Sequence, residues 1–248
     1  MSVSSYRLNG LAVYSSSADK SGLQIVLVHG AVDRAAGMIR IARKLNDLNV
    51  VRYDRRGYGR SGSAPSTLSF EKHLADLEIV VGGRPTVLFG HSYGGSLALA
   101  AAARGSSNIC ATVVYEAPRG WEDWWPPPPS SVTPEEAAQH FVRRMVGETR
   151  WSALPEVSRA RIRDQGERMV FELQTQMTQR YDAASISTPL LVGVGELSGE
   201  HAHRAARLAA DEAPNGELFT VAEGRHDAPM THPDLIADLL RQAIARPR

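Results

Sequence analysis

A serine flanked by glycines is the residue best suited to chemistry, in the segment Gly90-His91-Ser92-Tyr93-Gly94-Gly95. A buried-strand pattern precedes this segment and an alanine-rich helical pattern follows it. In a G-x-S-x-G turn between a strand and a helix, small neighbours permit a sharp corner that exposes the serine hydroxyl above the sheet. The Tyr93 N–H, at the helix start, faces the place where a substrate oxyanion would form. We therefore predict Ser92 as a nucleophile and the Tyr93 N–H as an oxyanion donor.

A serine hydroxyl attacks only when a neighbouring base accepts its proton. Eight histidines are present, and position along the chain separates them. His226 follows the last predicted strand, so it belongs to the sheet edge that also carries Ser92. His91 is predicted to pack beside the nucleophile, whereas His73 and His140 lie in polar helical stretches and are predicted to be on the surface. We predict that His226 is the base.

A second oxyanion donor is expected from the segment His29-Gly30-Ala31, which follows the first buried strand. The backbone N–H of Ala31 is the candidate donor. The side chains of His29 and of Val32, which follows this segment, are candidates for substrate contact. A histidine that ends a strand more simply ties down its own loop, and this interpretation is favoured for His29.

The arginine-rich segment Tyr53–Ser61 invites a phosphate-binding interpretation. Gly57 and Gly59 instead favour a tight turn in which Asp54 pairs locally. We therefore do not expect a phosphate site in this segment.

The predicted secondary structure alternates between strands and helices, which indicates βαβ units. Continuous apolar runs are typical of parallel strands that are buried on both faces. Such runs lie at Ile25–Val28, Thr86–Phe89, Thr112–Tyr115, Leu190–Val194 and Leu218–Val221. Helical spacing of apolar residues lies at Ala36–Leu48, Phe70–Val81, Ser96–Ala103, Ala202–Ala213 and Leu235–Ala245. The predicted fold class is α/β with a parallel sheet.

An insertion of different composition is expected at 118–187, between core segments 1–117 and 188–248. It opens with Trp121, Trp124, Trp125 and the stiff run Pro126–Pro129, and continues with helical patterns at Glu135–Val146 and Arg159–Tyr181. We expect a helical cap over the carboxyl edge of the sheet. The three tryptophans either line a substrate pocket or anchor the cap on the core.

Together the segments at 29–31, 53–61, 90–95 and 224–226 resemble the α/β-hydrolase superfamily over nearly the whole chain. The resemblance implies an eight-stranded, mostly parallel sheet with helices on both faces and the cap inserted after the sixth strand. It also implies two additional strands at Ser4–Leu8 and Leu11–Ser15, and a Ser–His–acid triad that needs no cofactor or metal.

The acid departs from the common pattern of that superfamily. Most members carry an aspartate in the loop after the strand at 190–194, where this chain has Ser198. A serine cannot supply the charge that stabilises an imidazolium. Some members place the acid at the end of the preceding strand, where this chain has Glu116, and a carboxylate there is costly unless it is paired. We favour Glu116, with Glu196 as the alternative and Asp227 ranked low; a salt bridge that holds the cap is the other interpretation of Glu116.

A serine nucleophile disfavours the dehalogenase and epoxide hydrolase activities of this superfamily, which use aspartate. The leading hypothesis is hydrolysis of a carboxylic ester or lactone of a small, largely apolar substrate through an acyl-enzyme. The alternatives are a C–C bond or thioester hydrolase or a lyase with the same triad, and a ligand receptor with little or no turnover.

Charge and composition limit the classes of molecule that the protein is expected to bind. The net charge of +1 and the single cysteine among 248 residues disfavour nucleic acid binding and a disulfide framework. The beginning of the sequence lacks a signal-peptide pattern, and the longest apolar run, Leu97–Ala103, is too short to span a membrane. We expect a cytoplasmic monomer or homodimer that acts on a small molecule and binds neither membranes nor nucleic acids.

Overall fold

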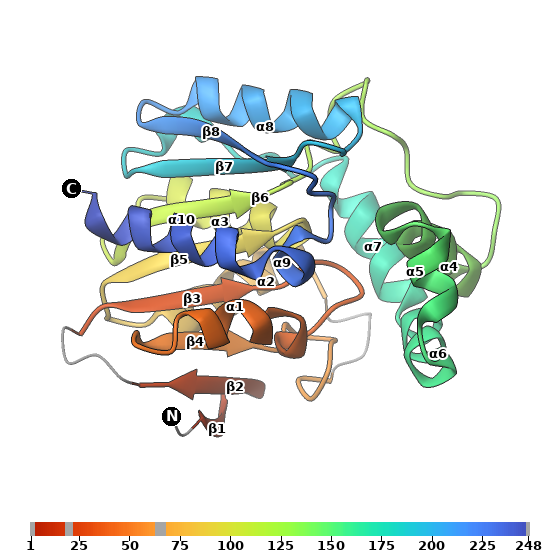
Figure 1. Ribbon diagram of the computed structural model, residues 1–248, viewed down its shortest axis with the longest axis horizontal. Coiled ribbons are helices and arrows are strands. Elements are labelled where there is room, and N and C mark those ends of the chain that lie inside the picture. The colour runs from red at the N-terminus through yellow and green to blue at the C-terminus, as the bar shows by residue number, and fades with distance from the viewer. Residues whose placement is uncertain (1–2, 18–21, 63–67, 247–248) are drawn as a thin grey trace.

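The computed structural model describes residues 3–17, 22–62 and 68–246. Within these residues one sheet has the strand order β1-β2-β4-β3-β5-β6-β7-β8. Strands β3 to β8 run parallel, whereas β2 pairs antiparallel with both β1 and β4 (Figure 1). The strands are β1 (Val3–Leu8), β2 (Leu11–Ser16), β3 (Gln24–Val28), β4 (Val50–Tyr53), β5 (Thr86–His91), β6 (Ile109–Tyr115), β7 (Leu190–Gly195) and β8 (Gly216–Val221). This eight-stranded, mostly parallel sheet confirms the predicted fold class.

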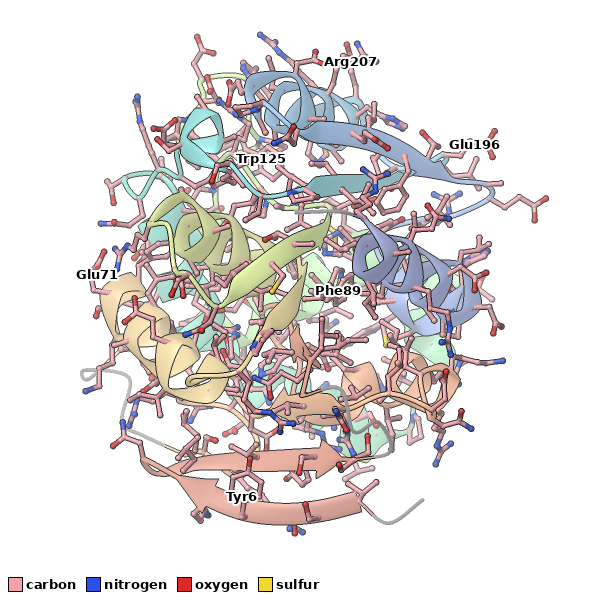
Figure 2. All side chains as sticks on the ribbon, turned by 90° about the vertical axis from the view of Figure 1, so that its left-hand side faces the viewer. Tyr6, Glu71, Phe89, Trp125, Glu196 and Arg207 are labelled. Carbon is pink, nitrogen blue, oxygen red and sulfur yellow. The ribbon has the colours of Figure 1, made fainter. Side chains whose placement is uncertain are left out.

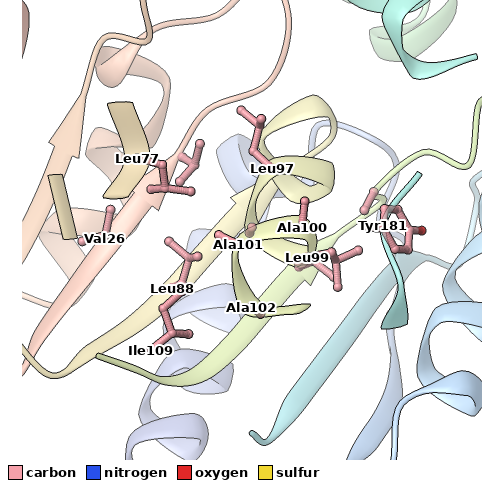
Figure 3. Packing of buried hydrophobic residues seen from close by; sticks show 14 of the residues in the cluster. Val26, Leu77, Leu88, Leu97, Leu99, Ala100, Ala101, Ala102, Ile109 and Tyr181 are labelled. Carbon is pink, nitrogen blue, oxygen red and sulfur yellow. The ribbon is translucent and has the colours of Figure 1, made fainter. Parts of the chain in front are cut away.

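Helices cover both faces of the sheet. One face packs against α2 (Phe70–Val81), α3 (Tyr93–Ala103) and α8 (Glu200–Glu212), and Figure 3 shows part of this apolar cluster, including Val26, Leu88 and Leu97. The other face packs against α1 (Ile39–Lys44) and α10 (Pro233–Ala245), with Phe89 in the middle of the molecule (Figure 2). The short elements η1 (Ala35–Met38) and α9 (Ala228–Thr231) pack beside α1, and η3 (Ala183–Ser185), near the end of the segment 118–187, packs against α3 and α8. None of the helices within the described ranges is sufficiently long and apolar to cross a bilayer.

Four helices of the segment 118–187 lie together beyond the carboxyl ends of the parallel strands (Figure 1). They are α4 (Pro134–Val146), α5 (Glu148–Ala153), α6 (Glu156–Asp164) and α7 (Gly166–Gln176). A capping box between Thr133 and Glu136 begins α4, because each side chain accepts a hydrogen bond from the other residue's backbone N–H. These helices share a small apolar cluster with Ala31 of the core. We call residues 118–187 the insert and propose that it is a cap.

The helical pattern at Arg159–Tyr181 forms two helices, α6 and α7, with a break at Gln165, and the second of them ends at Gln176. Gly166, directly after the break, permits a close approach between two helices. A Cβ there would lie 2.1 Å from the backbone oxygen of Pro134, so α7 begins where the chain passes directly against the start of α4. The periodicity of one segment does not reveal such a contact between two helices.

Candidate active site

Ser92 occupies a sharp turn between β5 and α3. Its φ of 54° lies in the left-handed region, which is uncommon for a residue with a side chain. The sharp turn is possible because Gly90 and Gly94 lack side chains. A Cβ on Gly94 would lie 2.4 Å from the backbone oxygen of Val28, and a Cβ on Gly90 would lie 2.4 Å from the backbone oxygen of Gly94. Tyr93 is the first residue of α3, so its N–H has no partner within the helix.

Glu116 and His226 are joined directly. Glu116 follows β6, has a φ of 48°, and places Oε2 2.8 Å from Nδ1 of His226. Because a carboxylate only accepts, His226 carries its proton on Nδ1, which leaves Nε2 free to accept a proton. The Glu116 side chain is 4% exposed. Burial alone would raise its pKa, but hydrogen bonds from His226, Ser198 and the Gly195 N–H lower the pKa of Glu116 to about 2, so the carboxylate is ionised.

Ser198 binds the other oxygen of the same carboxylate. Its hydroxyl donates to Glu116 Oε1, which also accepts the Gly195 N–H at 3.0 Å. Glu196, the alternative acid, instead accepts the backbone N–H of Glu223 at 2.8 Å and lies at the periphery of the molecule (Figure 2). The carboxylate that contacts His226 is therefore Glu116.

Asp227, next to His226, forms an ion pair with Arg150 of α5. The Asp227 side chain is 6% exposed, so this contact ties the His226 loop to the insert. A salt bridge that holds the insert was the alternative interpretation of Glu116, and the structure gives that contact to Asp227.

Ser92, His226 and Glu116 all face one cavity of about 300 Å³, between the carboxyl edge of the sheet and the insert. Within the described residues no hydrogen bond joins the Ser92 hydroxyl to His226, and such bonds are often long before substrate binds. The wall of the cavity is mainly apolar and includes Ala31, Pro118, Trp125–Pro129, Phe141, Met145, Leu173, Met177 and Leu197. Its size and lining suit a small organic ligand.

The other side chains proposed for substrate contact lie outside this wall as the described residues define it. Trp121 packs on Tyr181 with ring centres 4.8 Å apart, and Trp124 lies against Trp125 and under the guanidinium of Arg204. Of the three tryptophans, Trp125 faces the cavity, Trp124 packs against Trp125, and Trp121 packs on Tyr181. His29 is fully buried, and Val32 packs against the apolar cluster of the insert.

The sequence comparison with protein families matches residues 25–239 to the alpha/beta hydrolase family. The chain belongs to this family. A comparison with curated protein sequences finds no match.

Solved structures similar to this α/β-hydrolase include enzymes with different activities. An alpha/beta hydrolase from Sphaerobacter thermophilus is 27% identical, with a TM-score of 0.71 over 98% of this chain and 100% of that one. Est816, described as an N-acyl homoserine lactone degrading enzyme, is 20% identical, with a TM-score of 0.78 over 96% and 99%. The epoxide hydrolase CorEH is 18% identical, with a TM-score of 0.75 over 98% of both chains. At such identities the last two show the shared fold.

Sequence patterns missed a buried polar group of this α/β-hydrolase. His73, predicted at the surface, is 1% exposed, and its Nε2 lies 3.4 Å from Oε1 of Glu172, which is fully buried. A polar residue in a helical pattern is typical of a solvated face, so nothing local marked this pair. The Tyr53–Ser61 segment does form the predicted turn, where Asp54 accepts the N–H groups of Ala35 and Arg60 at 2.8 Å each.

Proposed function

We propose that this α/β-hydrolase cleaves a carboxylic ester or lactone of a small, largely apolar substrate. Ser92 is the nucleophile, His226 the base and Glu116 the acid. The observation that carries the proposal is the 2.8 Å contact between Glu116 Oε2 and His226 Nδ1 at the wall of the cavity that Ser92 also faces. This contact holds the imidazole in the tautomer that a general base needs.

In the proposed reaction the Ser92 oxygen attacks the acyl carbon while Nε2 of His226 takes the hydroxyl proton. The negative charge that forms on the carbonyl oxygen is held by the N–H groups of Tyr93 and Ala31. When the tetrahedral intermediate collapses, the C–O bond of the leaving alcohol breaks and His226 returns the proton to that alcohol. Water then attacks the acyl-enzyme by the same route and releases the acid and free Ser92.

The charge of the cavity supports one refinement of the substrate class. Arg144 and Arg225 lie in its wall. Among the described wall residues Glu116 is the one that carries a carboxylate, and this carboxylate is already paired with His226. Arg225 donates to the backbone oxygen of Leu197 at 3.2 Å. An apolar substrate with an acidic group at one end would match this wall.

The proposal is tested with short-chain p-nitrophenyl esters, lactones and thioesters, and with a fluorophosphonate probe that labels activated serines. We expect the parent to turn over esters or lactones and to be labelled, and Ser92→Ala to lose both properties. Equal hydrolysis by Ser92→Ala would refute the mechanism. Tight ligand binding without turnover of any acyl substrate would favour a receptor instead.

A further inference from the structure

A fully buried ion pair joins the insert to the loop after β4. Arg55 donates from Nη1 to Oε1 of Glu172 at 2.5 Å and from Nη2 to Oε2 at 3.1 Å, and both side chains are 0% exposed. Tyr58 also donates to Oε2 at 2.8 Å. Burial alone would raise the pKa of Glu172, but Arg55 and His73 hold this pKa at about 2, so the carboxylate of α7 is ionised. A buried ion pair often contributes little net stability, because desolvation of the two charges offsets their attraction.

The same guanidinium holds the backbone of the predicted oxyanion loop. Nε donates to the carbonyl oxygen of His29 at 3.0 Å, and Nη2 donates to that of Gly30 at 2.9 Å. In a trans peptide unit the C=O and N–H groups point in opposite directions. The peptide unit between Gly30 and Ala31 contains the Gly30 carbonyl and the Ala31 N–H, and Ala31 faces the cavity. Arg55 therefore binds the carbonyl of the same peptide unit whose N–H is the proposed oxyanion donor.

His29 provides a second hold on the same carbonyl. Its Nε2 lies 2.9 Å from the backbone N–H of Arg55, which can only donate, so the His29 proton is on Nδ1. Nδ1 then donates to the Gly30 oxygen at 2.8 Å. Burial and the nearby Arg55 charge hold the pKa of His29 well below its ordinary value, so the ring stays neutral. Arg55 also lies over the ring of Tyr93, the residue that carries the other proposed donor, at 4.9 Å from its centre.

We propose that Glu172 of the insert is a positioning residue, which aligns the Ala31 N–H through Arg55 and the Gly30 carbonyl. Placement of the insert and formation of the oxyanion hole are then a single event. This inference rests on the proposed function, because it assigns Glu172 to the stabilisation of that reaction's oxyanion.

The test separates alignment from folding. Glu172→Gln leaves Arg55 buried without its counter-charge and can destabilise the fold, so the decisive variant is Arg55→Met/Glu172→Leu, which replaces the whole pair by apolar groups. We expect this double variant to fold, with a lower melting temperature because the buried Tyr58 hydroxyl and His29 carbonyl lose their partners. Its kcat for an ester falls about 10- to 100-fold with KM within threefold, because a misplaced donor costs less than the roughly 10²- to 10³-fold loss of a deleted one. The inhibition constant of a matching trifluoromethyl ketone, which forms an oxyanion on Ser92, rises by the same factor.

The matched control is Arg56→Met/Asp76→Leu. It removes the neighbouring ion pair, at 2.6 Å, which contacts neither the oxyanion loop nor Glu172. We expect parental kcat and parental inhibition by the ketone. If a folded Arg55→Met/Glu172→Leu variant keeps the parental kcat and the parental inhibition constant, the positioning role of Glu172 is overturned and the proposed function stands. A parent that turns over no acyl substrate overturns the proposed function together with this inference.

Discussion

Ser198 donates a hydrogen bond to the carboxylate of Glu116. Ser198 stands where the resemblance to the α/β-hydrolase superfamily leads us to expect the triad aspartate, and the carboxylate that it contacts is that of Glu116, the proposed acid, at the end of β6. The carboxylate thus accepts Ser198 and the Gly195 N–H on Oε1, and His226 on Oε2. These three donors restrain its position from both sides.

If Glu116 is the acid, Glu116→Gln will lower kcat by about 10³- to 10⁴-fold, since the amide cannot stabilise the imidazolium and favours the wrong tautomer of His226. Steady-state hydrolysis of a p-nitrophenyl ester measures this loss. Glu196→Gln is the control, because Glu196 contacts the backbone of Glu223 instead, and it should keep nearly parental kcat. Equal, mild effects of the two changes would refute the assignment of Glu116.

The support from Ser198 can be measured separately. Ser198→Ala removes one hydrogen bond to a charged group, a contribution of about 1.5–3 kcal/mol, part of which the Gly195 N–H retains. We expect kcat to fall about tenfold and KM to change little. Ser198→Thr, which keeps the hydroxyl, should preserve most of the activity. An unchanged kcat in Ser198→Ala would mean that this hydroxyl does not help to position the acid.

Acid should destabilise the protein in a defined window. The pKa values of Glu116 and Glu172 are about 2 in the folded state, against ordinary values of 4.5. Between these values the folded state binds fewer protons than the unfolded state, so the stability they contribute is present above about pH 4.5 and is lost as the pH falls toward 2. Urea unfolding at pH 3, 4 and 6 measures this slope. Arg55→Met/Glu172→Leu should show a shallower slope, and a slope equal to the parent's would contradict the lowered pKa of Glu172.

The two arginines in the cavity wall, Arg144 and Arg225, predict a preference among esters. A p-nitrophenyl ester with a terminal carboxylate on its acyl chain should have a lower KM than its neutral counterpart of equal length. Arg144→Gln should raise KM several-fold for the carboxylated ester only. Arg143→Gln is the matched control, because Arg143 pairs with Glu148 on the surface of the insert and lies outside the cavity wall. The same KM for both esters in the parent would show that these arginines do not select an acid.

Local patterns were sufficient to predict β3, β5, β6, β7 and β8 and the turn that holds Ser92, whereas β1 and β2 were expected from the family resemblance and no range was predicted for β4. Uninterrupted β-branched runs occur where strands are buried on both faces, and the glycines around Ser92 are needed because backbone atoms approach within 2.4 Å of where their Cβ atoms would lie. Helix Phe70–Val81 has the predicted bounds for the same reason: its apolar spacing is regular, and Ser69 caps its start.

The buried polar contacts could not be predicted in this way. Arg55 and Glu172 are 117 positions apart, and neither lies in an apolar run that would mark it as buried. Helical periodicity treats Glu172 as part of a solvated face, although it is fully buried. The position of Trp125 in the cavity wall likewise depends on how the insert packs, since three nearby tryptophans offer the same signal in sequence.

The ion pair between Asp227 and Arg150 limits how this α/β-hydrolase can be redesigned. Insert helices contact the predicted machinery at two places, through Arg150 beside His226 and through Glu172 behind Ala31. An insert taken from another α/β-hydrolase to change substrate choice would remove both partners and leave Arg55 and Asp227 without counter-charges. A successful exchange would therefore have to carry an arginine at the first place and a glutamate at the second, so the insert is not an interchangeable module.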